Sequence, residues 1–319
     1  MIEVKNLTKR YGNHLAVDHL NFTVESGKIY GFLGPNGAGK STTMNIMTGY
    51  LGATEGQVLI DGHDILKEPE EAKKNIGYLP EIPPLYMEMT VREYLEFAAE
   101  LKGIKKDKRE PQIEEVIRLA KLRDVENRLI QNLSKGYKQR VGLAQAVLGF
   151  PEIIILDEPT VDLDPKQIIE IRELIRKLAK KHTVILSSHI LAEVREVCDY
   201  IMIISGGKLV ASDTTENLEN MMSGKGQIEV EAKASRDEMD HIIRRTGKIK
   251  EVKYRTSASG ITTAQIIAKG GEDIREELFL AFSHADVPML TLNQSKTTLE
   301  EIFLELTQGS GNRMIKEEK

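Results

Sequence analysis

A glycine-rich loop between an apolar run and a helix start constrains this chain more than any other feature. Residues 34–42 read Gly-Pro-Asn-Gly-Ala-Gly-Lys-Ser-Thr. The apolar run at residues 28–33 has the length of a strand, and residues 42–47 begin a helical pattern. Strand, glycine loop and helix in this order bring backbone N–H groups and a helix N-terminus to one point. An ordinary tight turn is the alternative, but it does not require the Lys40–Ser41 pair that ends the loop.

The loop predicts a site for phosphate groups. Glycines let successive N–H groups turn inward and form a nest for an anion. Lys40 is expected to reach the β- and γ-phosphates of a nucleotide, and the Ser41 hydroxyl to bind Mg²⁺. The residues predicted to contact the nucleotide here are Gly34, Asn36, Gly37, Ala38, Gly39, Lys40, Ser41 and Thr42.

A second signal is a pair of carboxylates at the end of an apolar run. Residues 153–156 are apolar, as expected of a buried central strand, and Asp157 and Glu158 follow them. The carboxyl ends of strands in a doubly wound sheet face the same crevice as the glycine loop. Asp157 is therefore predicted to hold Mg²⁺, and Glu158 to orient and deprotonate the attacking water. A solvated strand end is the alternative.

Between these two signals the pattern is helical, over about residues 87–149. Apolar residues recur at helical spacing, which predicts a helical insert in an α/β core. The charged segment 102–110 is expected to be an exposed connector. Ser134 and Gly136 open a further helix, and the N-terminus of that helix is either a simple helix start or a second anion site.

The length of 319 residues and a change of pattern near residue 221 predict two domains. Residues 1–220 form the first, and 221–226 are expected to be a linker. Residues 227–319 follow the order βαββαβ with a last helix at 298–306, which predicts a small α+β ferredoxin-like domain. We find no glycine loop or catalytic cluster in that part of the sequence.

Charge and apolar content exclude some classes of protein. The formal net charge of −5 argues against a broad nucleic-acid interface, which calls for a basic domain. The start of the chain has no apolar signal segment, and no apolar run approaches the roughly 20 residues of a spanning helix. A membrane role would therefore need a partner. The single cysteine, Cys198, fits a reducing compartment and is expected to be buried.

The order of these motifs over about residues 1–218 resembles the ATP-binding subunit of an ABC transporter. Tyr11 matches the aromatic residue that stacks on adenine in that family, and residues 34–42 match Walker A. Residues 133–137 match the signature motif, 153–158 Walker B and 161–164 the D-loop, and His189 matches the switch histidine. By itself, Tyr11 could equally be a loop tyrosine, and a histidine after a strand is more often structural.

The resemblance implies a fold and a mechanism. The fold is an α/β P-loop NTPase of ABC type, with a mixed central sheet, an N-terminal antiparallel β subdomain and a helical subdomain. Two copies, or one copy and a paralogous ATPase, would pair head to tail. Each ATP would lie between the Gly34 loop of one subunit and Ser134 and Gly136 of the other. Glu158 would polarise water, His189 would bind the γ-phosphate, and Asp164 would couple the two sites.

The chain departs from the family pattern at two places. Glu81 stands where the family has glutamine. It is expected to reach Mg²⁺ or its water together with Ser41 and Asp157. Activity is expected to survive, with altered metal or coupling behaviour, because the glutamate adds a negative charge beside ATP. In the signature motif, Lys135 and Tyr137 replace a glycine and a glutamine, whereas Ser134 and Gly136 remain. The export branch of the family accepts both changes.

The leading hypothesis is the ATPase subunit of an exporter with its permease on a separate chain, peripheral on the cytoplasmic face of the membrane. Residues 133–146 and 299–307 resemble the gliding-motility and multidrug-export branch, whose ATPases carry an added C-terminal domain. Here that domain is expected to serve dimerisation or regulation. The alternative is a soluble ABC ATPase acting on ribosomes or DNA, but the chain has one core, no heptad run and no basic face. Intact Glu158 and His189 argue against a non-hydrolysing regulator.

Overall fold

The structure is a computed structural model that describes residues 1–218, 227–257, 260–295 and 303. Its residues divide into two compact units, Met1–Thr215 and Glu216–Glu305, and each is described by itself. The predicted linker at 221–226 and the predicted last helix at 298–306 fall outside the described residues, apart from residue 303. The division at residue 220 therefore stays a prediction.

The first unit is built on a six-stranded sheet with the order β10-β9-β3-β8-β7-β6. These strands are β3 (Ile29–Leu33), β6 (Ile76–Leu79), β7 (Ile153–Leu156), β8 (Thr183–Ser188), β9 (Tyr200–Ser205) and β10 (Lys208–Thr214). All neighbours are parallel except β9 and β10. Every residue of β3, β7 and β8 is buried, because helices or a second sheet cover both faces. The carboxyl ends of these three strands therefore meet at one edge.

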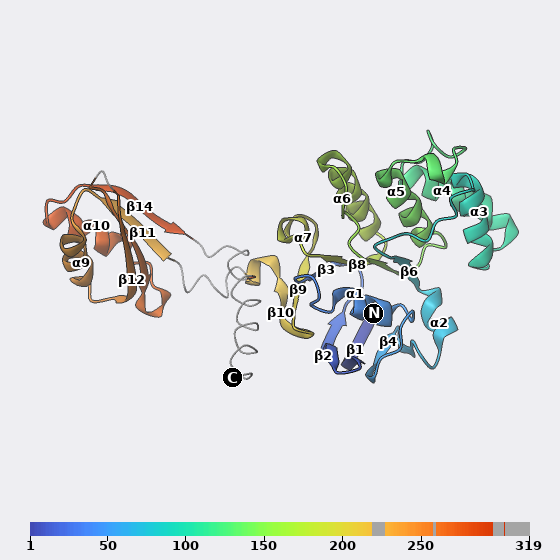
Figure 1. Cartoon of the computed structure of the whole chain (residues 1–319), viewed down its shortest axis with the longest axis horizontal. Helices are drawn as coiled ribbons and strands as arrows, with labels where there is room; N and C mark the ends of the chain where they lie inside the picture. Colours follow the sequence, from blue (N-terminus) through green and yellow to red (C-terminus); the bar gives the residue numbers. More distant parts are fainter. Residues whose placement is uncertain (219–226, 258–259, 296–302, 304–319) are drawn as a thin grey trace. The chain divides into compact units, whose positions relative to one another are not determined.

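A second, antiparallel sheet has the order β2-β1-β4-β5. It comprises β1 (Ile2–Tyr11), β2 (His14–Val24), β4 (Glu55–Ile60) and β5 (His63–Asp64), with α2 (Pro69–Lys74) beyond it. This sheet and α1 (Lys40–Met47) lie on one face of the six-stranded sheet, and α6 (Pro165–Ala179) and α7 (Leu191–Val197) lie on the other (Figure 1). One apolar core joins the two sheets, with the rings of Phe22 and Phe32 5.5 Å apart.

Three helices between β6 and β7 form the predicted helical insert (Figure 1). They are α3 (Val91–Leu101), α4 (Lys106–Leu119) and α5 (Lys135–Val147), with a short 3-10 turn at Ile130–Asn132. The expectation of a loop over 102–110 was wrong in its second half, because α4 begins at Lys106. Charged side chains favour helix here because they find partners: Arg92 pairs with Glu110 at 2.9 Å, and Arg109 Nε donates to the Ile104 carbonyl at 2.8 Å.

Over the described residues between 227 and 295, the second unit is an antiparallel sheet with the order β12-β13-β11-β14, together with helices α9 and α10 (Figure 1). Its elements are β11 (Gln227–Ala232), α9 (Arg236–Arg244), β12 (Ile249–Thr256), β13 (Thr262–Ala268), a 3-10 turn (Lys269–Gly271), α10 (Arg275–His284) and β14 (Met289–Ser295). The predicted order βαββαβ is confirmed for these residues. The two helices supply Met239, Leu278 and Phe282 to a buried apolar cluster.

Two further observations bear on the expectations from the sequence. Cys198, directly after α7, is buried as predicted, and burial raises the pKa of its thiol. Among the described residues, no helix combines the length and the apolar character that a membrane crossing needs.

Candidate functional site

The glycine loop packs closely against the antiparallel sheet. Helix α1 begins at Lys40, and Gly39 before it has φ 102°, in the left-handed region that favours glycine. A Cβ atom at Gly39 would lie 2.5 Å from the Ala16 carbonyl oxygen of β2. No side chain caps the helix, and its first turn has no acidic residue. Its N-terminus is therefore suited to an anion.

An open cleft of about 500 Å³ lies beside this loop. Ten residues predicted from the sequence line it: Tyr11, Asn36, Gly37, Gly39, Lys40, Ser41, Thr42, Glu81, Glu158 and His189. His14 and Ala16, which sequence reasoning missed, also line it, and so does Val161, the first residue of the D-loop match. The cleft therefore gathers segments that lie far apart in the chain, and its volume is that of a small-molecule site.

Two loop residues that were predicted to contact the nucleotide, Gly34 and Ala38, do not line the cleft. Gly34 contributes its carbonyl oxygen, which accepts a hydrogen bond from Lys40 Nζ at 2.8 Å. Ala38 is buried, its N–H donates to the Pro35 carbonyl at 3.1 Å, and its carbonyl accepts from Gly207 N. The structure thus places Ala38 behind the loop, where its N–H already has a partner.

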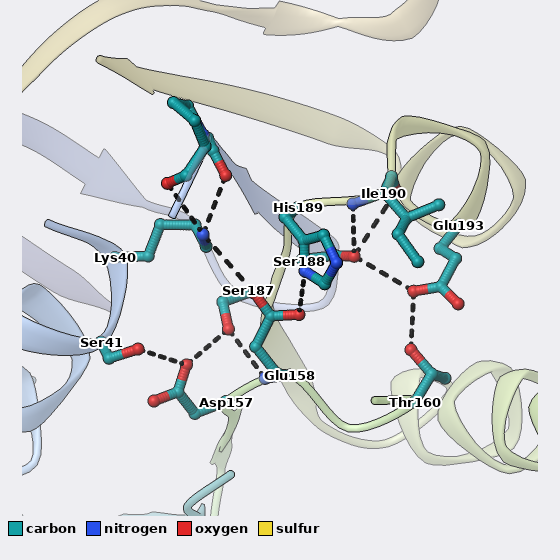
Figure 2. A network of polar contacts seen from close by, with 12 residues as sticks. Lys40, Ser41, Asp157, Glu158, Thr160, Ser187, Ser188, His189, Ile190 and Glu193 are labelled. Atoms are coloured by element: carbon teal, nitrogen blue, oxygen red, sulfur yellow. Dashed lines mark hydrogen bonds and ion pairs between the residues drawn. The ribbon is translucent and has the colours of Figure 1, made fainter. Parts of the chain in front are cut away.

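Glu158 lies between the lysine of the loop and the histidine after β8 (Figure 2). One carboxylate oxygen is 3.5 Å from Lys40 Nζ and the other is 3.0 Å from His189 Nδ1. Glu158 and Lys40 are buried, whereas the His189 side chain is 38% exposed and reaches the cleft. The arrangement puts a carboxylate, an ammonium group and an imidazole at one wall of the cleft.

Asp157 lies below Glu158 and beside Ser41. The Ser187 hydroxyl donates to its Oδ1 at 2.6 Å, and the Ser41 hydroxyl donates to the same atom at 3.2 Å (Figure 2). Burial raises the pKa of the Asp157 carboxyl, although the two hydroxyl groups oppose the rise. A bound cation would stabilise this buried carboxylate in its charged form.

The residues predicted to hold the metal share a second cleft. Ser41, Glu81 and Asp157 all line an open space of about 800 Å³ next to the first. Within the described residues, no group of three or more His, Cys, Asp or Glu side chains forms a metal site of its own. A hydroxyl and carboxylate oxygens are nevertheless the hard ligands that suit Mg²⁺, which keeps several waters and shares phosphate oxygens. The residues present therefore fit Mg²⁺.

Tyr11 is the last residue of β1. Its side chain is about half exposed, and Lys9 Nζ lies 5.4 Å from its ring centroid. An exposed aromatic ring at the rim of the cleft is able to stack on a nucleotide base. This role for Tyr11 stays a prediction.

The signature residues lie away from the cleft of their own chain. Ser134 is the exposed N-cap of α5, and its hydroxyl makes no capping hydrogen bond. Asp164 caps α6 by accepting from Gln167 N at 2.9 Å, and a Cβ atom at Gly136 would lie 2.5 Å from the Gln167 side chain. Gly136 and Asp164 line a separate cleft of about 310 Å³, whose lining shares no residue with the cleft of Lys40.

Sequence reasoning also missed a set of polar residues that hold the site. Ser187 links β8 to the end of β7, because its hydroxyl oxygen accepts from Glu158 N at 2.8 Å. Thr160, Ser188 and Glu193 form a second link nearby (Figure 2). The only signal in the sequence is the serine pair that ends β8, and it does not reveal which partners those serines take.

A glycine loop at a helix N-terminus, beside a buried carboxylate and a carboxylate–hydroxyl pair, is the arrangement expected of a nucleoside triphosphatase. The family model for ABC transporters matches residues 17–161. The chain is 42% identical over 221 residues to the bacitracin transport ATP-binding protein BcrA of Bacillus licheniformis, covering 69% of this chain and 71% of that protein. The chain therefore belongs to the ATP-binding proteins of ABC transporters, and it is an ATPase.

One relative matches nearly the whole chain. The linearmycin resistance ATP-binding protein LnrL of Bacillus subtilis is 30% identical over 308 residues, 96% of this chain and 98% of that protein. Among solved structures, a dimeric ATP-binding cassette in a post-hydrolysis state, bound to ADP and Pi, is similar with a TM-score of 0.61. It is 28% identical and covers 67% of this chain and 98% of that one.

Proposed function

We propose that this chain is the ATP-hydrolysing subunit of an exporter, with Glu158 as the base and Lys40 and His189 as its catalytic partners. The observation that carries the proposal is the position of Glu158, in contact with both Lys40 and His189 at one wall of the cleft. The similarity to a cassette that is bound to ADP and Pi also supports ATP hydrolysis by this chain.

In this mechanism the glycine loop and the N-terminus of α1 hold the phosphates, and the Tyr11 ring covers the adenine. The Lys40 ammonium has three donors, and it contacts two loop carbonyls and Glu158. A γ-phosphate competes with Glu158 for this cation, which leaves the carboxylate available to take a proton from water. His189 contacts the other oxygen of Glu158 and orients both the carboxylate and the γ-phosphate.

Two copies complete the site. In one chain, Ser134, Gly136 and Asp164 lie outside the cleft of Lys40, and the Ser134 hydroxyl makes no capping bond. A second copy or a paralogous ATPase, docked head to tail, would bring its α5 N-terminus to the γ-phosphate, where the helix dipole favours an anion. The dimeric cassette among the similar structures supports this proposal.

Mg²⁺ would be held by Ser41, Glu81 and Asp157, and it would neutralise negative charge on the phosphates. Ser41→Ala removes a hydroxyl ligand, so we expect the Mg²⁺ concentration for half-maximal ATPase activity to rise on the order of tenfold. Titration of MgCl₂ at saturating ATP measures this. Thr48→Ala is the control, because it removes a hydroxyl that bonds the Met44 carbonyl at the other end of α1. An equal shift in both variants would contradict the metal role of Ser41.

The proposal that the transporter is an exporter is based on the names of two similar proteins. BcrA and LnrL are named for bacitracin transport and linearmycin resistance, and this supports a permease on a separate chain, with the ATPase peripheral on the cytoplasmic face of the membrane. Affinity purification of the tagged chain from detergent-solubilised membranes is expected to recover one integral membrane protein in stoichiometric amount. Recovery of ribosomes or DNA in its place would favour the alternative of a soluble ABC ATPase.

The sequence of the ferredoxin-like unit contains no glycine loop and no catalytic cluster. Its role is therefore proposed to be dimerisation or regulation. The match to LnrL over 96% of the chain supports an arrangement of ATPase domain and C-terminal domain shared by the two proteins.

A further inference from the structure

A buried carboxylate, that of Glu193, lies close to the Glu158–His189 pair and has no part in the roles given above. Glu193 lies in the first turn of α7 and is 7% exposed. Its Oε2 atom accepts one hydrogen bond from Thr160 Oγ1 at 2.6 Å and another from Ser188 Oγ at 3.1 Å (Figure 2). A buried carboxylate is costly to the fold unless it is paired, so its position needs an explanation.

The two hydroxyl groups belong to the two segments that carry the catalytic pair. Thr160 follows Glu158 in the loop after β7, and Ser188 precedes His189 at the end of β8. The Ser188 oxygen also accepts from Ile190 N at 3.0 Å, so it is tied to the residue on the far side of His189. One oxygen of Glu193 thus connects the segment of the base to the segment of the histidine.

The backbone of Glu158 needs such support. Its φ of 47° lies in the left-handed region, which is strained for a residue with a side chain. Strain of this kind persists only where the surroundings hold it. Glu158 N donates to Ser187 Oγ at 2.8 Å on one side, and Thr160 is held by Glu193 on the other. The Glu193 bond is therefore one of the anchors on the strained turn, together with the backbone bond from Val161 N to the Glu158 carbonyl at 3.2 Å.

Charge around Glu193 is balanced from α6. Arg172 Nη2 lies 3.9 Å from Glu193 Oε1, and Arg172 is itself mostly buried. Glu193 lines neither the cleft of Lys40 nor the cleft of Asp157. Glu193 therefore acts on hydrolysis through the residues that it contacts, of which Thr160 and Ser188 adjoin the catalytic pair, and not through contact with the nucleotide.

We infer that Glu193 is a positioning residue for ATP hydrolysis, which holds the Thr160 and Ser188 segments so that Glu158 and His189 meet across the cleft wall. This inference rests on the proposed roles of Glu158 and His189. A carboxylate in the first turn of a helix also stabilises that helix, because it interacts favourably with the helix dipole. The competing explanation is therefore that Glu193 only stabilises α7. The two explanations differ in how kcat and KM respond.

The test compares Glu193→Ala with Glu193→Gln. Loss of the carboxylate frees both segments, and we expect kcat to fall on the order of 10- to 100-fold, because small misplacements of a catalytic group have effects of this size. KM for ATP is expected to stay within about threefold, since the phosphate loop is not touched. Glu193→Gln keeps an oxygen that accepts both hydroxyl groups, so it is expected to restore most of kcat.

Glu196→Ala is the matched control. Glu196 lies on the same helix, its side chain is 58% exposed, and it also pairs with Arg172. Its loss removes the same charge but no bond to Thr160 or Ser188, so kcat should be unchanged. Equal losses of kcat in Glu193→Ala and Glu196→Ala, or a rise of KM as large as the fall of kcat, would overturn the positioning role.

Thr160→Val tests the same bond from its other end and keeps the inference falsifiable if Glu193→Ala does not fold. Valine lacks the hydroxyl but has nearly the same side-chain shape as threonine. We therefore expect this variant to lower kcat several-fold. In the double variant the two losses should not add, because both remove one interaction. Full activity of Thr160→Val overturns the inference. If Glu158→Gln also retains activity, the proposed catalytic roles fail as well; if it does not, only the role of Glu193 fails.

Discussion

Glu158→Gln is expected to lower the ATPase rate by about 10²-fold or more while ATP still binds. The amide keeps the size of the side chain and adds no new strain at φ 47°, but it cannot take a proton from water. General-base catalysis contributes about 10²- to 10⁴-fold, and that contribution is lost. The removal of a negative charge beside the phosphates also favours retention of ATP. Steady-state hydrolysis assays and binding of a fluorescent ATP analogue measure the two effects.

The matched control for this variant is Glu152→Gln. Glu152 is exposed and directly precedes β7, the strand that Glu158 follows. The same change of charge there should leave the rate within about twofold, since surface substitutions away from a site have small effects. Hydrolysis by Glu158→Gln at the wild-type rate would show that another group is the base, and the Lys40–Glu158–His189 arrangement would then need a different explanation.

Some contacts of the site can be predicted from the local order of residues in the sequence, and others cannot. The glycine loop and the Asp157–Glu158 pair each join a buried strand to polar residues at its carboxyl end, and parallel strands bring such ends together. The sequence therefore indicated that Lys40 and Glu158 would approach each other. The link between Glu193 and Thr160 spans 33 residues and depends on how α7 packs on the loop after β7. An acidic residue in a helix gives no sign of that contact.

At the charged segment 102–110, the sequence led to a wrong prediction of secondary structure. Its composition indicated an exposed loop, but helix α4 begins inside it at Lys106. Lysine, arginine and glutamate have high helix propensity, and Arg92 on α3 supplies a partner for Glu110. Charge alone does not separate a solvated loop from a solvated helix. The deciding contact lies on another element, which the sequence of the segment does not contain.

If two copies pair head to tail, two variants that are each inactive should restore ATP hydrolysis when they are mixed, which a site complete in one chain would not allow. Lys40→Ala is expected to abolish hydrolysis, because it removes the cation that holds the phosphates. Ser134→Glu is expected to abolish it for a different reason, since it places a negative charge where the second subunit would meet the γ-phosphate. Ser134 is exposed and makes no capping bond, so the substitution should not disturb the fold. Each variant alone would be inactive in a homodimer.

Mixing the two inactive variants in equal amounts should restore activity. Each composite site takes Lys40 from one copy and Ser134 from the other, so a mixed dimer has both lesions in one site and none in the other. Half of the dimers would be mixed, and one of the two sites in each mixed dimer would be intact. The mixture should therefore hydrolyse ATP at about one quarter of the wild-type rate, if the sites act independently and each lesion acts only in its own site. If Ser134 acted within its own chain, every site would carry one lesion and the mixture would stay inactive. The recovery therefore distinguishes a site shared between two copies from a site complete in one.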